Sequence, residues 1–542
     1  MTFPTAAVPP EGLSLSASVS FGATTFAAGA VAPILFDLGG FDYTASGRIN
    51  LKSSVTFTKG GTVSAGAGRL FENVHDLVLH VTGATTFLSR QNLGLYRSRD
   101  VSLTFAEDAV LDCTQHDNYN IAFYLESVSD AELTFDHATA KFYTVNIGGK
   151  ENGKTGPVSN LNWTVCNGAA VSFHNYGISL SRGVYLGSSK ADGYSVSNRL
   201  TVADAMFDCS KGEFRLCGQG DRLAVTNATF TTKALKFLNA RDCEVAFTDS
   251  TVAGAISFGA DSCGNALTVA DCATFPNVTV DGVSNRVVLA RGASTRLPTF
   301  AGGGAGKTFE IAGGAVTNTS FTFSGTNVTV VVRDGGRLQY GVGAVTRDGF
   351  NFKPGQTKDV TLRVADGGTV GIRGMVNFFN NETATYDWTN CPNSAIEFTG
   401  HTSSLVCHDY TANYQTLGLG TADETPLTDA VALRFVVPAG GYAAAPIRNE
   451  IKGRDIRLWG NQPIEIRLAD GFVPTKALRV PLVSCVNGFS QTPMDAARLA
   501  KLTANATFPD AEAYKTALRY DAATKTLVAS IRPRRGALLI LR

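Results

Sequence analysis

A repeat of about 22 residues constrains the fold of this chain more than any other feature of its sequence. Successive segments carry a marker Asn or Asp, one variable residue and then alternating apolar positions, and they begin at Asn198, Asp221, Asp242, Asn265 and Asn285. The register extends upstream through Asp76, Asp100, Asp130 and Asn160, and downstream through Lys307, Asn327 and Asp359. A unit this short cannot bury its own apolar face, so successive units must stack into a continuous core.

Each repeat contains three short alternating segments separated by turn residues, as in "SNRLTVADAMF" from Ser197. Three strands of about four residues and three corners make one coil of a parallel β-helix, with about 22 residues per coil. The sequence therefore predicts an all-β, single-stranded parallel β-helix with Leu200, Val202 and Phe207 facing inward. The marker suits a corner, because Asn and Asp tolerate the left-handed backbone region. A β-sandwich does not explain a constant period that carries the same corner residue.

The repeat also predicts how the chain is divided. We expect an N-terminal cap at residues 1–45, the β-helix repeat at residues 46–420 and a β-rich C-terminal cap at residues 421–542. The C-terminal cap is predicted to contain one short helix that begins at Thr492, with Pro493 in its first turn.

The segment "AGGGAGKT" (301–308) fits a permissive form of the phosphate-binding loop. Such a loop needs a helix directly after Gly-Lys-Thr, whose N-terminal amides face the phosphates. The following residues, "FEIAGGAVTNTSFTF", alternate as strands do. We therefore interpret Gly306, Lys307 and Thr308 as a β-helix corner and predict no nucleotide site.

Coils such as "GNALTVADCATF", rich in Gly, Thr and Ala, together with the closing "YDAATKTLVASI", carry a resemblance to known proteins. The fold resembles the right-handed parallel β-helix of the pectin-lyase-like superfamily. The composition is similar to that of bacterial autotransporter-passenger and β-strand-repeat surface proteins. This resemblance implies a secreted or cell-surface solenoid that acts as an adhesin or in carbohydrate binding. In the enzyme branches it implies cleavage of acidic polysaccharides.

Composition excludes several other classes of protein. Lys and Arg number 47 and Asp and Glu number 46, so charge gives no reason to expect a nucleic-acid partner. No C-x-x-C spacing occurs among the ten cysteines, and we expect most of them to be buried free thiols. Pairing of Cys209 with Cys217, or of Cys263 with Cys272, is the alternative in an oxidising compartment. We expect no membrane-spanning segment. The sequence shows no secretion signal, which indicates either a protein that is not exported or a trimmed or partial one.

Marker spacings lengthen between Asp100 and Asn198, so extra loops leave neighbouring coils. Stacked coils lie about 4.8 Å apart, so loops that emerge at like corners would form one wall. Aromatic faces beside hydrogen-bonding and charged groups suit sugar rings. The predicted ligand-binding residues are Tyr119, Lys150, Lys154, Tyr176, Tyr185 and Tyr194. The candidate catalytic residues are His116, Asp117, His174 and Arg182. Solvent-exposed loops are often rich in such residues without binding any ligand. The alternative is therefore that these are ordinary surface residues with no binding role.

Pectin-type hydrolases of the resembled fold carry Gly-His-Gly and Asp-Asp groups, and neither group occurs here. Lyases of that fold need only acidic groups, a basic residue and, in some cases, calcium. Asp76, Asp100 and Asp130 share one register position on three coils, where stacked carboxylates would recruit a cation. Three separate corner aspartates that point to water are the alternative.

Three functions are compatible with these sequence features. The leading hypothesis is a non-enzymatic extracellular scaffold that binds a polysaccharide or a cell-surface glycan, with no cofactor. The alternative is a polysaccharide lyase or another carbohydrate-active β-helix enzyme, for which calcium would be the cofactor. A third hypothesis is a structural spacer within a larger surface protein. The sequence does not decide between a monomer and an oligomer.

Overall fold

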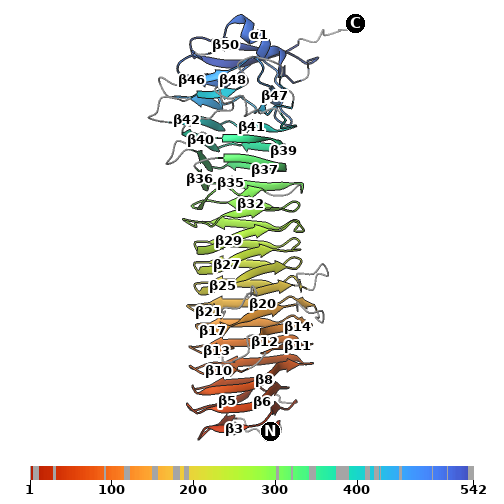
Figure 1. Cartoon of the computed structure of the whole chain (residues 1–542), viewed down its shortest axis with the longest axis vertical. Helices are drawn as coiled ribbons and strands as arrows, with labels where there is room; N and C mark the ends of the chain where they lie inside the picture. The colour runs from red at the N-terminus through yellow and green to blue at the C-terminus, as the bar shows by residue number, and fades with distance from the viewer. Residues whose placement is uncertain are drawn as a thin grey trace, which may run out of the picture. The chain divides into compact units, whose positions relative to one another are not determined.

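The computed structural model of the protein consists of short strands stacked in long parallel ladders (Figure 1). It describes residues 2–3, 11–28, 32–90, 93–114, 122–148, 157–174, 184–187, 195–300, 304–318, 321–340, 350–373, 390–408, 416–419, 427, 429–450, 455–490, 492–509 and 511–534. The prediction of an all-β chain built from stacked parallel strands is confirmed, and the ladders are consistent with a parallel β-solenoid.

The chain forms two compact units, residues 1–278 and residues 279–542, with β31 (Val278–Val280) at the boundary. The predicted cap and repeat boundaries near residues 45 and 420 stay predictions. Parallel pairing already occurs before residue 45, since Leu13 pairs with Phe36 and Ile34 pairs with Val55.

Unit 1 has three strand faces, and one pass through all three is one rung. Face one contains β3 (Val19–Phe21), β10 (Thr86–Ser89), β13 (Val110–Asp112), β17 (Thr139–Phe142) and β21 (Ala170–Phe173). Face two contains β1 (Thr2–Phe3), β4 (Thr24–Phe26), β11 (Leu93–Tyr96), β14 (Ala122–Glu126), β18 (Thr144–Ile147) and β22 (Val184–Gly187). Long strands run through both faces, namely β6 (Tyr43–Leu51), β8 (Thr62–Glu72), β25 (Met206–Cys217), β27 (Thr229–Phe237) and β29 (Thr251–Phe258).

Face three is the most regular ladder of unit 1. It contains β2 (Leu13–Ser14), β5 (Ile34–Asp37), β7 (Val55–Thr58), β9 (His75–Val81), β12 (Arg99–Ala106), β16 (Glu132–Asp136), β20 (Asn162–Cys166), β24 (Arg199–Ala203), β26 (Arg222–Thr226), β28 (Glu244–Thr248) and β30 (Ala266–Ala270). The strands that lead into its middle rungs are β15 (Val128–Ser129), β19 (Val158–Ser159) and β23 (Ser195–Val196).

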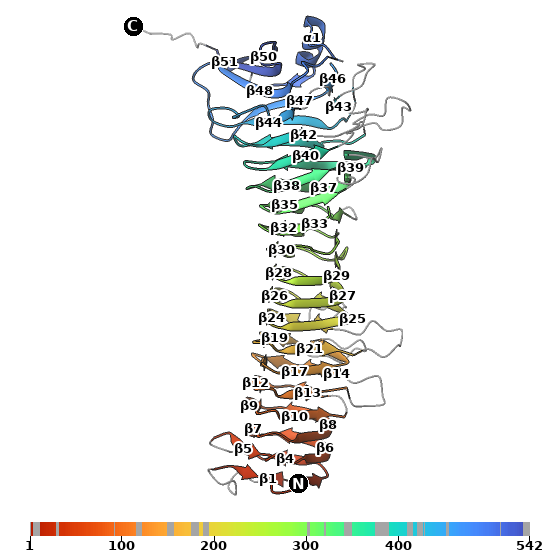
Figure 2. The ribbon, with the colours of Figure 1, turned by 90° about the vertical axis from the view of Figure 1, so that its left-hand side faces the viewer.

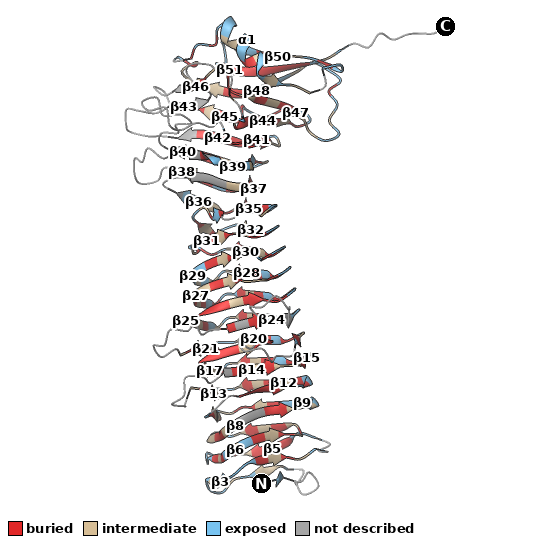
Figure 3. Ribbon diagram, turned by 45° about the vertical axis from the view of Figure 1, so that its right-hand side comes forward, coloured by how far each residue is buried: buried red, intermediate tan, exposed pale blue. Residues whose placement is uncertain are grey.

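Strict alternation explains why these segments form strands. In β24, Leu200 and Val202 are fully buried, whereas Arg199 and Thr201 face outward. The inward residues stack on their equivalents in neighbouring rungs, and Trp163 packs between Phe142 and Phe207. The buried side chains therefore form one core along the inside of the strands (Figure 3). Burying a large apolar side chain contributes roughly 1.5–3 kcal/mol, so the stack compensates for rungs that are unstable alone.

The marker of the sequence repeat proves to be two adjacent positions. Its first position has a positive φ, and it is occupied by Asp76, Asp100, Asp130, Asn160, Ser197, Gly220, Asp242, Gly264, Ser284, Gly306, Asn327 and Asp359. The second position, one residue later, points inward, and it is occupied in unit 1 by Asn198, Asp221, Cys243 and Asn265. The assignment of all the markers to one column with Asn198 and Asp221 was therefore wrong by one residue for those at the first position, namely Asp76, Asp100, Asp130, Asn160, Asp242, Asn327 and Asp359. Asn and Asp suit both positions, one through the left-handed backbone and the other through buried hydrogen bonds.

The inward position forms a polar ladder in unit 1. Asn198 Oδ1 accepts from the Leu161 amide at 2.9 Å. Asp221 Oδ1 accepts from the Asn198 amide at 2.9 Å and from Asn198 Nδ2 at 3.1 Å. Asn265 Oδ1 accepts from the Cys243 amide at 3.0 Å. These fully buried side chains satisfy main-chain groups at the corner, which would be costly to bury without a partner.

Unit 2 has two main parallel ladders. The first contains β32 (Arg286–Leu289), β35 (Lys307–Ala312), β37 (Phe321–Arg333), β39 (Phe350–Val364), β41 (Ala395–Thr399), β44 (Ala432–Val437), β47 (Ile464–Leu468) and β49 (Ala506–Thr507). The second contains β33 (Ser294–Thr295), β36 (Ala315–Asn318), β38 (Arg337–Tyr340), β40 (Thr369–Arg373), β42 (Ser404–His408), β45 (Ile447–Asn449) and β48 (Leu478–Cys485). The remaining strands are β34 (Thr299–Phe300), β43 (Thr416–Leu419) and β46 (Asp455–Leu458).

The parallel order of unit 2 ends in an antiparallel sheet. β48 pairs with β51 (Thr526–Pro533), which pairs with β50 (Tyr514–Asp521), and α1 (Ala496–Ala504) lies beside them (Figure 2). The sequence predicted that the helix begins at Thr492, but it begins at Ala496. Asp495 is its N-cap, and the Asp495 carboxylate accepts a hydrogen bond from the Arg498 amide at 2.8 Å. Within the described chain, no helix has the length and apolar character that a membrane crossing requires.

Candidate functional site

Most of the site residues predicted from the sequence lie outside the described residues. These are His116, Asp117, Tyr119, Lys150, Lys154, Tyr176, Arg182 and Tyr194. The structure does describe where the chain enters and leaves the segments that contain them. It also describes His174, the backbone of Tyr185, the corner aspartates and the Gly-Lys-Thr corner.

The four segments that contain the predicted loop residues all join face two of unit 1. Residues 115–121 connect β13 to β14, and residues 175–183 connect β21 to β22, so both enter face two from face one. Residues 149–156 follow β18, and residues 188–194 follow β22, so both leave face two toward face three. Two segments are therefore attached at each border of face two, where the lengthened spacings predicted one wall.

The outward positions between these attachment points form one column, which we call the face-two strip. It consists of Tyr124, Asn146, Tyr185, Arg215 and Lys236, which are register partners on successive rungs. Each lies between two inward apolar residues, as Tyr124 does between the buried Phe123 and Leu125. Neighbouring rungs lie about 4.8 Å apart, so Tyr124 and Asn146, and likewise Arg215 and Lys236, offer polar or aromatic groups at that step.

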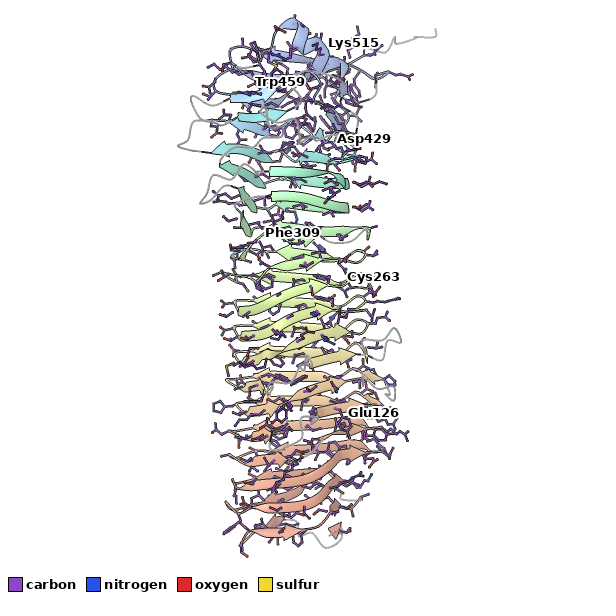
Figure 4. The ribbon with its side chains drawn as sticks, viewed as in Figure 1. Glu126, Cys263, Phe309, Asp429, Trp459 and Lys515 are labelled. Atoms are coloured by element: carbon purple, nitrogen blue, oxygen red, sulfur yellow. The ribbon has the colours of Figure 1, made fainter. Side chains whose placement is uncertain are left out.

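Gly94 gives the Tyr124 ring its place on face two. A Cβ at Gly94 would lie 2.2 Å from the Tyr124 carbonyl oxygen and 3.0 Å from Cγ of its ring. The ring therefore rests against the backbone of the preceding rung. Tyr96 lies two positions later on that rung, pairs in register with Glu126, and has the Arg97 guanidinium 4.8 Å from its ring centroid. Glu126 is labelled in Figure 4.

A charged cluster occupies the later rungs of the strip. Glu213 accepts from Arg215 Nε at 2.8 Å and pairs with Lys236 Nζ at 2.8 Å. The Glu213 and Arg215 side chains are only 10% and 16% exposed, so water screens this pair weakly. Burial alone would raise the pKa of Glu213, but the hydrogen bonds from Lys236 and Arg215 outweigh it and lower that pKa. Two cations against one carboxylate leave this end of the strip positive.

The described face-two residues can stack, donate and accept hydrogen bonds, and attract an anion. The Glu213 carboxylate is committed to two cations, so it is a poor general base. His174 follows β21, and its Nε2 lies 3.2 Å from Ser172 Oγ. The nearby Asp208 carboxylate accepts from the Ser210 amide at 2.9 Å. A Ser-His-Asp arrangement is thus not assembled by the residues that the structure describes.

The three aspartates proposed for a metal occupy separate corners. Asp76, Asp100 and Asp130 have φ values of 55°, 50° and 53°. Asp76 lies 2.6 Å from His75 Nδ1, and the Asp130 carboxylate accepts from Asn160 Nδ2 at 2.9 Å. Across the described ranges, no group of three or more His, Cys, Asp or Glu side chains could hold a metal ion. The geometry therefore fits three hydrated or locally paired turn residues.

The Gly-Lys-Thr segment lies in a corner that strands surround. Gly306 has a φ of 73°, and Lys307 begins β35, where a phosphate-binding loop would continue as a helix. The Lys307 side chain is fully buried, so it is not presented to a phosphate. Cys209, Cys217 and Cys272 are buried free thiols, as expected for most of the cysteines, and Cys263 is an exposed free thiol.

The sequence contains a signal for the strip on the element before each marker. The segments "FYLES", "VYLGSS", "EFRLCGQ" and "LKFLNA" each place Tyr, Arg or Lys between two apolar residues. The outward positions at a constant offset from the marker include Tyr124, Arg215 and Lys236, none of which was predicted as a site residue. Comparison of the chain with protein-family models, curated proteins and solved structures finds no match. The site is therefore interpreted from its own residues.

Proposed function

We propose that this protein is a secreted or cell-surface scaffold that binds a glycan along the face-two strip without cleaving it. The observation that carries the proposal is the column of Tyr124, Asn146, Tyr185 and Arg215 on successive rungs. A polymer that lay along this column would meet the Tyr124 ring and, about 4.8 Å away on the next rung, the Asn146 amide.

We also propose the finer form of the fold, a single-stranded right-handed parallel β-helix similar to that of the pectin-lyase-like superfamily. Three faces joined by short corners support it, since each rung contacts only the rungs before and after it. The style of autotransporter-passenger and β-strand-repeat surface proteins supports an extracellular location. The thiols are compatible with that location, because seven of the nine cysteines whose side chains the structure describes are buried, and burial raises the pKa of Cys209 to about 12.

The test is to pass the purified protein over a panel of immobilised neutral and acidic polysaccharides. Tyr124→Ala should reduce retention at least about tenfold, the effect of losing roughly 1.4 kcal/mol of binding free energy. Thr134→Ala is the matched control, because Thr134 is an outward residue on face three of the same unit. Equal retention of the two variants would contradict binding at the strip.

The same panel decides between a binding scaffold and a lyase. A lyase leaves unsaturated sugar ends, which absorb in the ultraviolet. Retention without new absorbance supports the scaffold. New absorbance would overturn the non-enzymatic proposal, and His174 would then be the first described residue to substitute.

A further inference from the structure

A buried lysine lies beside a buried asparagine in unit 2. Asn285 and Lys307 directly precede the register partners Arg286 and Thr308, so they occupy equivalent positions on neighbouring parallel strands. Both are 0% exposed, and Phe309, the next inward residue of β35, is also fully buried. Phe309 is labelled in Figure 4. A lysine without solvent contact at an inward position is rare in proteins, so this one requires an explanation.

The surroundings favour the neutral amine of Lys307. Burial lowers the pKa of Lys307, and the nearby Asp281 carboxylate opposes that shift only in part. A neutral amine has a lone electron pair and is a nucleophile, as in other enclosed lysines. The electrophile that the register places next to it is the side-chain amide of Asn285.

Asp281 completes the group. The Asn285 Nδ2 donates to the Asp281 main-chain oxygen at 2.6 Å, which holds the amide beside this residue. The Asp281 carboxylate accepts from the Gly282 amide at 2.7 Å and lies close enough to Lys307 to influence its charge. An amine, a carboxamide and a carboxylate are thus collected on two adjacent rungs.

We propose that Lys307 and Asn285 join in an intramolecular amide bond that the protein forms by itself. Lys307 Nζ attacks Cγ of Asn285, and a C–N bond forms while the bond from Cγ to Nδ2 breaks. The Asp281 carboxylate takes a proton from the attacking nitrogen and gives it to the leaving nitrogen, which departs as ammonia. One amine and one carboxamide become one secondary amide and one ammonia, with no change in oxidation state.

This bond would explain the burial of the lysine, because a secondary amide carries no charge into the core. The competing explanation is a structural one, in which Lys307 ends a polar ladder through hydrogen bonds alone. The two differ in covalent mass and in the products of digestion. The proposal is independent of glycan binding, so neither result decides the other.

The test is the intact mass of the purified full chain followed by tryptic mapping. The expected mass is lower than that of the sequence by one ammonia. Acylated Lys307 resists trypsin, so residues 242–286 should appear joined to residues 297–333 in one branched peptide. Cyclisation at an Asn-Gly pair such as Asn167-Gly168 also releases ammonia, but it gives no branched peptide. An unshifted mass, or cleavage after Lys307 with no branched peptide, overturns the proposal.

Two variants separate the covalent bond from a structural contact. Asn285→Asp should give the same final mass as the native chain, since an acid and an amine lose water where the amide lost ammonia. Lys307→Met keeps the side chain long and apolar, and it should show the full mass of its sequence with no branched peptide. If Lys307→Met does not fold, the masses and tryptic peptides of the native chain and of Asn285→Asp still show whether the amide bond forms. A branched peptide in Lys307→Met would contradict the assignment.

Discussion

Face three of unit 1 and the first ladder of unit 2 differ in the residues at the outward position in the middle of each strand. We call these positions the outward column. In unit 1 it carries Thr104, Thr134, Thr164 and Thr201 on four successive rungs. In unit 2 it carries Arg363, Glu397, Arg434 and Glu465 on four successive rungs. The inward neighbours are apolar in both cases, as with Leu133 and Ile396. The difference teaches that inward residues specify the stacked strands, whereas the outward column sets how neighbouring rungs are held together.

The centre of the charged column of unit 2 is largely removed from water, whereas Arg363 at its start is 45% exposed. Glu397 accepts from Arg363 Nε at 2.5 Å and from Arg434 Nη1 at 3.1 Å, and Arg434 Nε donates to Glu465 at 2.7 Å. Glu397 and Arg434 are only 8% and 14% exposed. Each charge therefore depends on the next rung, whereas a threonine on the surface depends little on its neighbours.

The largest expected difference follows from Glu397→Ala. It leaves two guanidinium groups without their shared carboxylate, and it should lower the free energy of unfolding by about 3 kcal/mol. Thr134→Ala, at the same column position in unit 1, should change that free energy by no more than about 0.5 kcal/mol. Urea denaturation of each variant measures both effects. Equal effects would show that the outward column has one role in both units.

Acid should weaken unit 2 through its glutamates. Burial alone would raise the pKa of Glu310, but hydrogen bonds from Arg286 and Arg333 outweigh it, so its pKa falls below the ordinary value of 4.5. The pKa of Glu465 is lowered in the same way by Arg434 and Arg467. Stability from a depressed pKa is complete above the unfolded value and is lost as the pH falls from about 5 through the folded pKa.

Hydrogen exchange at a series of pH values, corrected for the intrinsic rate, measures this acid response. Peptides from β35 and β47 should lose protection in acid before peptides from the threonine rungs β16 and β20. The response should flatten in Glu465→Gln, which cannot titrate. Simultaneous loss of protection in both sets would contradict the assignment of acid sensitivity to this column.

The smallest effect is expected from moving the charged pattern into unit 1. Thr134→Glu combined with Thr164→Arg places opposite charges in register on adjacent rungs. Both positions are partly exposed, so the coupling between the two substitutions should be below about 1 kcal/mol. A double-mutant cycle in urea measures it. A coupling as large as the effect of Glu397→Ala would mean that burial does not strengthen the pairs of unit 2.

The inward positions were predictable from the sequence, and the outward pairings were not. Leu200, Val202 and Phe207 were assigned to the core because a strand alternates with a period of two, and all three are fully buried. Glu397 pairs with Arg363 and Arg434 because the three residues are in register on neighbouring rungs. The number of residues between these rungs is irregular, so the sequence alone does not show which residues come into register. The sequence pattern grouped Asp242 with Asn198 because Asn and Asp suit both corner positions. Asp242 adopts the left-handed backbone at the first position, whereas Asn198 makes buried hydrogen bonds at the second.

The location that the sequence predicted for the site stays a prediction, and the strip residues were not predicted. Lengthened spacings indicated the rungs between Asp100 and Asn198, yet the site residues predicted there lie mainly outside the described chain. Tyr124 and Arg215 were not predicted, because loop composition does not show which strand positions face outward. The pairing of Glu213 with Lys236 of the next rung depends on the register shift in β25 between Cys209 and Glu213, and no local sequence pattern predicts that shift.

The rung register gives this protein a modular length. Removing residues 222–243 would bring Arg199 opposite Glu244, and it would keep apolar partners for Leu200 and Val202, which would lie opposite Val245 and Phe247. The same deletion would remove Lys236 and place Ser257 beside Arg215 in the strip. Duplication or loss of whole rungs could therefore lengthen, shorten or recharge the strip during evolution without creating a new fold. Ligand preference and foldability would then be separately variable in such a chain.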